Sequence, residues 1–590
     1  MRRSSIYSSS IPRDFNTLES IFGHSDSDDA NEPDGESGSH DSITDERTSN
    51  TQQTQYKSSS KRVSNEMDEE IARQRQSILN PQQPPQVHTP IPVSYDHDKV
   101  DNSTVMTELR IISIYLIPIW LTHLLEYSLN VASVLSVGHI DKMALAAMSL
   151  SSMTAAVTGL ALIQGFATGL DSLLATSYAS SNPALVGIWT SRMTVVIFLL
   201  LIPISAVWIN SERILLSIGQ DPQVAHLAGT YLRYFTVALP GFAGFELLRK
   251  FLQSCNNMHI PTIVLIVISP LNMLLQYLLV WKTSLGFIGS PIASAACIDL
   301  IAILLFAYVV LNPKTRQGTW GGFSHLMFKD LGVCFKLGAS AATMTLSEWA
   351  AWEGLAFAAS FISPTALAAQ SVINTSSSVS YQLPSALSVA SSVRIGNLMG
   401  KFLPNRASAA TKATIQFSFA MALINALVFL IFRKSFAKIF TSDSDVIELV
   451  ANILPLVALF QFTDGTISSC LGILRTTGRQ LMGAVIQITG FYIIGLPLAV
   501  CLAFLPRVNP ESYWPWPSAQ SDRLVGLWLG MSIALFLNFI AVLWIVSRIN
   551  WNRECTLADI RVRGTTHAED NETPPQSTPP NERQPLLGSN

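Results

Sequence analysis

The chain has 590 residues, of which 48% are hydrophobic and only 13% carry a charge. Soluble domains carry charge on about 25% of their residues, so this composition argues against an ordinary soluble protein. The net charge of −3 gives no basic field for nucleic acid. Six cysteines form no CxxC pair and lie mostly in apolar stretches, so we expect no disulfide framework, bound metal or other cofactor.

Polar tails flank the apolar region. Residues 1–108 are rich in Ser, Asp, Glu, Asn and Gln, and residues 552–590 contain several prolines. Such segments cannot bury enough apolar surface to offset their ordering entropy, so both are predicted to be disordered. The N-terminus lacks the apolar core of a signal peptide. Near the other end, Glu582 precedes Leu586 and Leu587, which resembles a dileucine sorting signal that a sorting adaptor would bind; chance occurrence stays open.

Twelve segments between the tails are long and apolar enough to cross a lipid bilayer, which takes about 20 residues per helix. They are 111–137, 143–168, 190–210, 229–249, 261–281, 291–311, 335–361, 366–392, 411–432, 450–472, 482–505 and 523–547. The pattern predicts an all-α integral membrane protein with about twelve transmembrane helices. An even number places both termini on one side, and the excess of Lys and Arg in the connectors on that side predicts that it is cytosolic.

The connector with Arg433, Lys434 and Lys438 is the exception to this rule, because it lies on the opposite side.

An internal repeat divides the apolar region. Residues 145–150, LAAMSL, resemble residues 367–372, LAAQSV, and residues 221–224 resemble residues 443–446 at the same offset. Six helices per half make the halves parallel repeats, an arrangement found in alternating-access transporters. We therefore predict two pseudo-symmetric six-helix bundles, 109–312 and 335–551, joined by a cytosolic linker, 313–334. A scaffold has no evident need of such a duplication, nor has a membrane enzyme.

Several short stretches carry a more specific pattern. They are SVGHID at 136–141, LRKFLQ at 248–253, EWAAWE at 348–353, ASSVRIGNLMG at 390–400 and GILRTTG at 472–478. Over residues 107–550 the chain resembles the multidrug and toxic compound extrusion (MATE) family in its eukaryotic, fungal branch. The resemblance implies a secondary transporter that exports organic compounds. Residues 176–180 and Thr476 depart from the family pattern, which puts local packing of helix ends in doubt.

Three carboxylates inside the second bundle are the first candidates for function. Glu348, Glu353 and Asp464 lie in predicted spans, where a charge costs about 2.5–3.5 kcal/mol. Burial favours the protonated form of a carboxylic acid, so such a residue can load and release a proton. It can also attract a cationic substrate, so that proton and substrate compete for one charge. The family resemblance assigns the same role to Glu348, Glu353 and Asp464.

Two tryptophans accompany these acids on the same predicted helix. Trp352 lies four residues from Glu348, and Trp349 four residues from Glu353, so each acid has an aromatic ring one turn away. Aromatic faces bind organic cations, which predicts that both line the cavity. Ordinary packing or contact with lipid is the alternative.

Charged residues elsewhere receive other predicted roles. His123 and Glu126 in the first span form either a proton relay or a buried polar pair that fixes helix packing. Asp171 is predicted to be an interfacial residue. Arg394 and Arg475 lie near cytosolic helix ends, where we expect them to set topology and close the cytosolic face through ion pairs.

The sequence as a whole predicts a proton-coupled antiporter that exports small organic, cationic or amphiphilic compounds from the cytosol. The vacuolar membrane is favoured and the plasma membrane is the alternative; sodium coupling stays open. A lipid-linked oligosaccharide flippase or a narrow-specificity metabolite carrier is the alternative function, although a flippase needs a cationic cavity for phosphate. A membrane-embedded enzyme is disfavoured because no His/Cys cluster is present, and no Walker A sequence indicates ATP-driven transport.

Overall fold

A computed structural model of the chain describes residues 102–316, 318–440, 443–505 and 519–563. These residues belong to one compact unit, and in the described ranges all regular structure is helical. Most of the predicted N-terminal tail and the dileucine residues Glu582, Leu586 and Leu587 lie outside the described residues.

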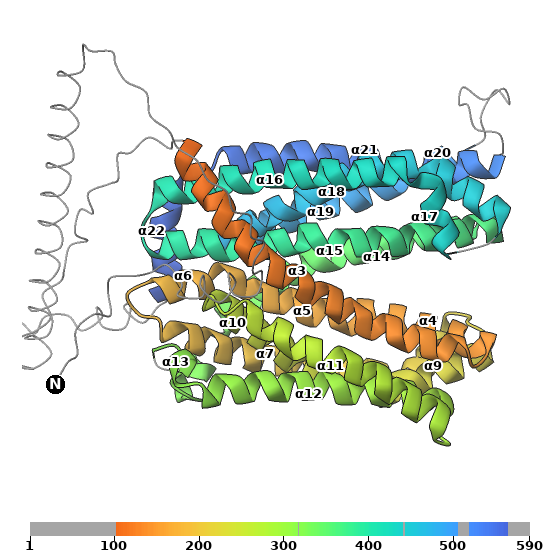
Figure 1. The fold of residues 1–590 in the computed structure, drawn as a ribbon, viewed down its shortest axis with the longest axis horizontal. Coiled ribbons are helices and arrows are strands. Elements are labelled where there is room, and N and C mark those ends of the chain that lie inside the picture. Colours follow the sequence, from red (N-terminus) through yellow and green to blue (C-terminus); the bar gives the residue numbers. More distant parts are fainter. Residues whose placement is uncertain (1–101, 317, 441–442, 506–518, 564–590) are drawn as a thin grey trace, which may run out of the picture. The chain divides into compact units, whose positions relative to one another are not determined.

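The first half contains the first six predicted spans (Figure 1). Its helices are α3 (Asn102–Gly138), α4 (Lys142–Ala155), η1 (Ala156–Leu160), α5 (Ala161–Thr168), η2 (Gly169–Ser172), α6 (Leu174–Ala179), α7 (Leu185–Ile209), α8 (Ser211–Ser217), α9 (Pro222–Phe235), α10 (Ala238–Ser254), α11 (His259–Tyr277), η3 (Leu278–Lys282), η4 (Gly286–Ile288) and α12 (Gly289–Leu311). Here η1 and η3 are π-helical turns, and η2 and η4 are 3-10 turns.

The second half contains the other six spans and a final short helix. After α13 (Pro313–Arg316) and η5 (His325–Phe328) come α14 (Leu331–Ser360), α15 (Pro364–Gly400), α16 (Pro404–Ile431), α17 (Arg433–Phe440), α18 (Ser444–Thr476), α19 (Gln480–Ile488), η6 (Thr489–Gly495), α20 (Leu496–Phe504), α21 (Ala519–Ser547) and α22 (Trp551–Arg563). Every predicted span overlaps one of these long helical segments.

The repeated aspartates found in the sequence perform the same local task in both halves. The Asp221 side chain accepts the backbone N–H groups of the first turn of α9, and the Asp443 side chain does so for α18. An aspartate at this position satisfies donors that have no partner inside the helix, which fixes where the helix begins. The equivalent starts show that the repeat extends to the detail of helix ends.

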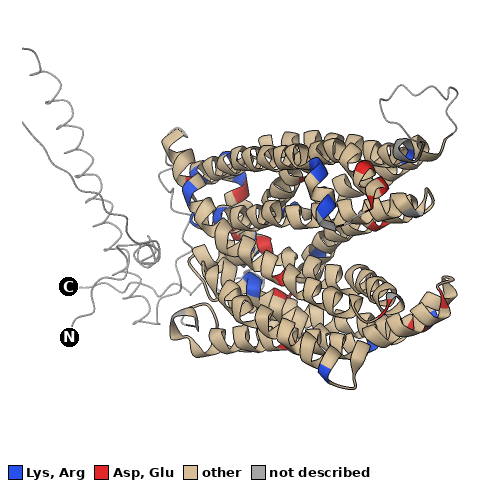
Figure 2. Cartoon of the chain, turned by 45° about the vertical axis from the view of Figure 1, so that its right-hand side comes forward, with Lys and Arg blue, Asp and Glu red and all other residues tan. Residues whose placement is uncertain are grey.

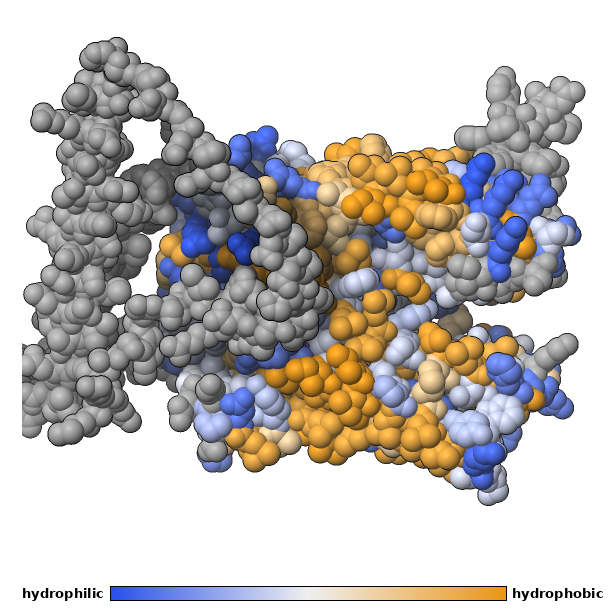
Figure 3. All heavy atoms as spheres, in the orientation of Figure 1, coloured by the Kyte–Doolittle hydropathy of each residue, from blue (hydrophilic) through white to orange (hydrophobic). Residues whose placement is uncertain are grey.

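The helices present an apolar surface suited to lipid. Nine segments in the described ranges are long and apolar enough to cross a membrane. The remaining predicted spans correspond to α14, α15 and the α9–α10 pair, so about twelve membrane helices remain consistent with the structure. Figure 2 shows long stretches of helix without Lys, Arg, Asp or Glu. Figure 3 shows hydrophobic side chains across the middle of one face and hydrophilic ones toward the helix ends.

The two halves share one packing scheme. In the first half, α10 packs against α5, α7 and α12, and α3 packs against α11. In the second half, α18 packs against α15, α16 and α21, and α14 packs against α19. The first helix of each half also crosses to the other, since α3 contacts α15 and α16 while α14 contacts α5 and α7. The fold is thus two equivalent helical bundles held together by their first helices.

The halves meet most closely at one end. We call this the tail-side end: α3 begins there, α21 ends there and α22 lies there (Figure 1). Gly400 of α15 lies against the Thr176 carbonyl of α6 so closely that a side chain at this position would collide with it. At the opposite end, Figure 3 shows the halves standing apart.

Helix α22 corrects the predicted start of the C-terminal tail at residue 552. Residues 551–563 form a helix whose Cys555, Ala558 and Val562 are buried against both halves. Their spacing of three and four residues places them on one helix face. The polar, proline-rich composition of the following residues obscured this short pattern. Helix α3 likewise begins at Asn102, before the predicted boundary of the first bundle.

Candidate functional site

Two carboxylates from different helices of the second half approach one another near mid-helix. Glu348 of α14 and Asp464 of α18 interact electrostatically, and Asp464 is only 4% exposed. The Tyr381 hydroxyl of α15 makes a hydrogen bond with the Glu348 carboxylate and accepts one from Ser468 Oγ at 3.2 Å. In the part of the chain that the structure describes, neither acid forms an ion pair with Lys or Arg. We call Glu348 and Asp464 the acid pair.

Glu353 is not brought to the acid pair. It lies five residues after Glu348 on α14, which places it about 140° around the helix. Its side chain is half-buried and makes no hydrogen bond or ion pair within the described ranges. The role predicted for Glu353 in coupling therefore stays a prediction without a supporting contact.

Trp352 packs among other aromatic rings. Its ring centroid lies 4.9 Å from that of Phe460 and 5.7 Å from that of Trp528, and the Trp528 indole N–H donates to Gln370 Oε1 at 2.9 Å. These contacts give Trp352 a packing role, the alternative that the sequence left open. Trp349 is half-buried on the same helix. For both Trp349 and Trp352, a role in substrate binding stays a prediction.

One cluster of acids in the first half is neutralised by a cation of the same half. The Arg249 guanidinium of α10 donates to Glu126 Oε2 of α3 at 2.6 Å and to both Glu246 oxygens at 2.6 Å. The expected pairing of His123 with Glu126 is therefore wrong, because Glu126 is bound to Arg249. The buried His123 ring instead lies against the Gln382 backbone of α15, and its Nδ1 has no partner.

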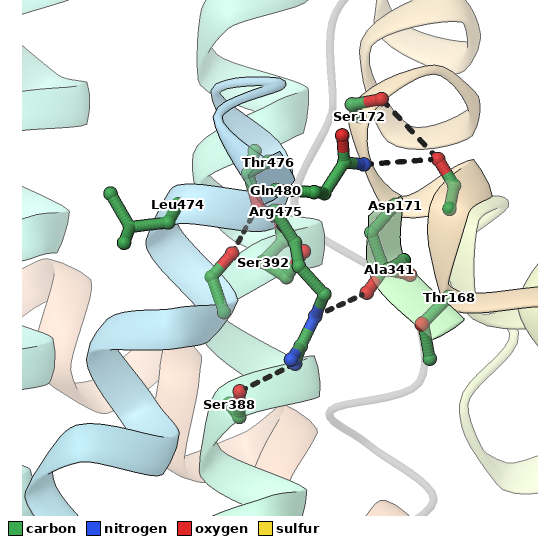
Figure 4. Close-up of polar contacts among 12 residues, drawn as sticks. Thr168, Asp171, Ser172, Ala341, Ser388, Ser392, Leu474, Arg475, Thr476 and Gln480 are labelled. Carbon is green, nitrogen blue, oxygen red and sulfur yellow. Dashed lines mark hydrogen bonds and ion pairs between the residues drawn. The ribbon is translucent and has the colours of Figure 1, made fainter. Parts of the chain in front are cut away.

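A cross-half ion pair lies between the acid pair and the tail-side end (Figure 4). Asp171 of η2 accepts from Lys250 Nζ of α10 at 2.7 Å and from Arg475 Nε of α18 at 3.2 Å. The other side of the Arg475 guanidinium donates to Ser388 Oγ at 2.8 Å. Asp171 is 8% exposed and therefore lies buried between the halves, and its predicted interfacial position at the end of the second span stays a prediction. Two cations from opposite halves make this burial tolerable.

A second ion cluster joins the start of α3 to the second half. Glu108 is fully buried. Its carboxylate forms ion pairs with Arg394 Nε of α15 at 2.6 Å and with Arg406 Nη2 of α16 at 2.7 Å. Arg394 and Arg475 thus both form ion pairs across the halves near the tail-side end. Whether these pairs act as a gate stays a proposal.

Weaker polar contacts complete this region. The Asn397 amide donates to Asn256 Oδ1 at 2.9 Å, and the Gln480 amide donates to the Gly169 carbonyl at 3.3 Å. Figure 4 shows Gln480 reaching from the α18–α19 connection toward η2. We call these contacts, with the ion pairs of Glu108 and Asp171, the tail-side contact layer.

Sequence reasoning missed three of the residues that matter here. Glu108 precedes the first predicted span and therefore counted as part of a tail. Tyr381 is one polar residue among many in a serine-rich predicted helix. Lys250 follows Arg249 at the end of a predicted span, so both were interpreted as cations of a connector. The only available signal was the position of each polar group inside or next to a membrane span, where it needs a partner.

The arrangement is suited to binding protons and cations. Two adjacent acids without a cation between them can hold a proton or attract a positively charged molecule. Among the residues that the structure describes, no group of three or more His, Cys, Asp or Glu side chains is placed to hold a metal ion.

Comparisons with known proteins agree with this geometry. The MatE family model matches residues 118–278 and 340–501, one segment in each half. An uncharacterized transporter of Schizosaccharomyces pombe is 36% identical over 454 residues, covering 77% of this chain and 81% of that protein. Human multidrug and toxin extrusion protein 1 is 30% identical over 459 residues, 78% of each chain. The crystal structure of the eukaryotic MATE transporter AtDTX14 superimposes with a TM-score of 0.71 at 25% identity, covering 78% of this chain and all of that one.

Proposed function

Because this chain belongs to the MatE family of membrane transporters, we propose that it is a proton-coupled antiporter in which the acid pair binds protons and organic cations in turn. One observation carries the proposal: Glu348 and Asp464 lie together in the second half and form no ion pair with Lys or Arg in the described ranges. By contrast Glu108, Glu126 and Asp171, which lie between the halves, each bind a Lys or Arg.

A proton and an organic cation compete for the negative charge of the acid pair. Two negative charges in one site of low polarity repel one another, so the empty pair favours taking up a proton. An organic cation in the same place supplies the same compensation. Proton and cation therefore exclude each other, which is the requirement for exchange. The names of two relatives describe extrusion of drugs and toxins, and we extend this broad substrate class to the present chain.

The direction of transport follows from topology. The positive-inside rule places the tail-side end in the cytosol, so protons would enter the acid pair from the opposite, open end. We propose the vacuolar membrane, with the plasma membrane as the alternative, since either maintains a suitable proton gradient. The sorting role of Glu582, Leu586 and Leu587 remains part of this proposal.

A flippase for lipid-linked phosphates receives less support from the same contacts. Such a protein needs free cations in its cavity to bind phosphate. Arg249, Lys250 and Arg475, the central cations between the halves, are all engaged by carboxylates.

The test uses purified protein in liposomes with an imposed inside-acid gradient and a fluorescent organic cation outside. We expect gradient-driven uptake by the parent protein, and a loss of at least about tenfold in Glu348→Gln and Asp464→Asn because one charge of the pair is gone. Glu212→Gln, the same change at an ion pair of the first half, is the control expected to retain uptake. Glu353→Gln is measured beside it as a separate test of the coupling role predicted for Glu353. Full uptake by both pair variants would overturn the proposal.

A further inference from the structure

Two runs of polar contacts, which meet at the hydroxyl and the carbonyl of Ser468, connect the acid pair with the tail-side contact layer. From Glu348 the first run passes to the Tyr381 hydroxyl, and from there to Ser468 Oγ at 3.2 Å. Ser388 Oγ donates to the Ser468 carbonyl at 2.7 Å and accepts from Arg475 at 2.8 Å.

The last contact of the second run crosses between the halves, where Arg475 Nε donates to Asp171 Oδ2 at 3.2 Å. We call the four residues Tyr381, Ser468, Ser388 and Arg475 the relay.

The helix packing makes this path possible. Helices α15 and α18 approach so closely that a side chain at Gly472 would collide with Ser388. This close approach brings Ser388 of one helix against Ser468 of the other, which is buried in the same interface. Hydrogen-bonded chains in a dry interior respond strongly to a change of charge at one end.

We propose that the relay transmits the charge state of the acid pair to the Arg475–Asp171 contact, so that loading of the pair loosens the tail-side contact layer. The proposal rests on the proposed function and adds the residues that position the gate. Arg475 lies between two carboxylates: it donates to Asp171 and interacts electrostatically with Glu348. With the pair empty and charged, both acids hold the guanidinium in place.

Neutralisation of Glu348 removes one of these two attractions. A proton, or a bound organic cation, cancels the negative charge that orients Tyr381 and attracts Arg475. The Arg475–Asp171 contact then has to compete alone against Lys250, which already neutralises Asp171 at 2.7 Å. The empty charged transporter is thereby kept closed at the tail side, and the loaded one can open. An exchanger needs this behaviour, because a transporter that changes state while empty dissipates the gradient.

Other charged groups near the relay are few. Asp464 and Arg475 come from α18, Glu348 from α14, Tyr381 from α15, Asp171 from η2, and Lys250 with Arg249 from α10. Of these, Lys250 and Arg475 pair with Asp171, and Arg249 pairs with Glu126 and Glu246, so the acid pair is the group whose charge proton binding changes.

The test measures the tail-side distance between the halves as a function of pH. Spin labels at Asn182→Cys and Lys401→Cys, both exposed tail-side connector positions in opposite halves, report this distance in the full chain. The exposed Cys501 is replaced by Ser in all variants. In the parent protein we expect acid to increase the population with a long distance.

Three relay variants and one control give the comparison. Ser388→Ala and Tyr381→Phe break the relay, and their distance distribution should no longer change between mildly alkaline and mildly acidic buffer. Ser388→Thr keeps the hydroxyl and should restore the response. Ser391→Ala is the matched control, because Ser391 is a buried serine of the same helix that hydrogen-bonds only the Ser388 carbonyl. It should behave like the parent.

Two outcomes would overturn the inference. A parent-like pH response in both Ser388→Ala and Tyr381→Phe shows that no signal passes through the relay. Equal loss of the response in Ser391→Ala shows a packing effect and no relay. Neither outcome touches the proposed function, which fails separately if Glu348→Gln and Asp464→Asn still exchange protons for cations.

Discussion

The two halves share a fold but treat their buried acids in opposite ways. In the first half, Glu126 and Glu246 are both bound by Arg249 at 2.6 Å. In the second half, Glu348 makes a hydrogen bond with the Tyr381 hydroxyl and interacts electrostatically with Asp464. Buried carboxylates in the two halves therefore differ in whether a cation neutralises them, and burial alone does not distinguish them.

The two halves differ because the spacing between acid and arginine differs on the two corresponding helices. Glu246 and Arg249 are three residues apart on α10 and pair along one helix face. Asp464 and Arg475 occupy the corresponding helix α18 but are eleven residues apart, about 16 Å along the axis. Arg475 therefore reaches Asp171 in the other half, and Asp464 stays without a cation. This difference in spacing gives one half an ion cluster and leaves the other half with two acids that have no Lys or Arg partner in the described ranges.

The largest expected effect is in the first half. Arg249→Leu would leave Glu126 and Glu246 buried without a cation, which costs about 3–5 kcal/mol and should sharply lower the thermal unfolding temperature and the yield of folded protein. The triple change Arg249→Leu, Glu126→Gln and Glu246→Gln removes all three charges and should recover much of the loss. Fluorescence-detected thermal unfolding measures both. An unchanged unfolding temperature in Arg249→Leu would remove the structural role of this cluster.

A smaller effect is expected where the halves join. Glu108→Gln keeps the shape of the side chain but loses the charge that holds Arg394 and Arg406. Arg406 is partly exposed and can turn to water, so we expect a loss of about 1–3 kcal/mol. Thermal unfolding again reports it, with Glu212→Gln at an exposed ion pair as the control expected to change little. Equal losses in the two variants would contradict the importance of Glu108.

Trp352 separates packing from substrate binding in the second half. Trp352→Phe keeps an aromatic ring against Phe460 and Trp528 and should change stability by less than about 1.5 kcal/mol, whereas Trp352→Ala leaves a cavity and should cost about 3–5 kcal/mol. Transport assays on folded Trp352→Phe protein complete the test. A large rise in the KM for organic cations without a loss of stability would favour the binding role over the packing role.

The smallest effect concerns a thiol at the tail-side end. Cys555 of α22 is 2% exposed, and burial raises the pKa of its thiol to about 12. Only the thiolate reacts with maleimide, so labelling should be slow at neutral pH and should still rise with pH well above the usual range of a cysteine. Val562→Ala, which weakens the docking of α22, should accelerate labelling. Rapid labelling at neutral pH of a chain in which the exposed Cys501 is replaced by Ser would show that α22 does not stay docked.

Much of the fold could be predicted because membrane spans have a strong signal. Each of the twelve apolar segments became a helix, and the matched aspartates at positions 221 and 443 cap corresponding helices. Helix α22 was not predicted, because its three buried residues occupy one narrow face of a polar segment. A few apolar residues on one face of a short helix are weak evidence for a helix when the following sequence is rich in proline.

The site was predicted in part. The candidate acids Glu348 and Asp464 come together, but Glu353 does not join them, and Glu126 pairs with Arg249 instead of His123. Sequence reasoning finds which residues need a partner, since charge in a bilayer is costly. It does not find the partner, because partners such as Asp171 and Arg475 are far apart in the chain and meet only when the halves pack.

Proton release on substrate binding tests the central claim most directly. Purified protein in weakly buffered solution with a pH indicator is mixed with an organic cation that it transports. The acid pair should release protons as the cation displaces them, and Glu348→Gln and Asp464→Asn should each reduce this release strongly while Glu212→Gln preserves it. Release that persists undiminished in both pair variants would contradict the assignment of coupling to the acid pair.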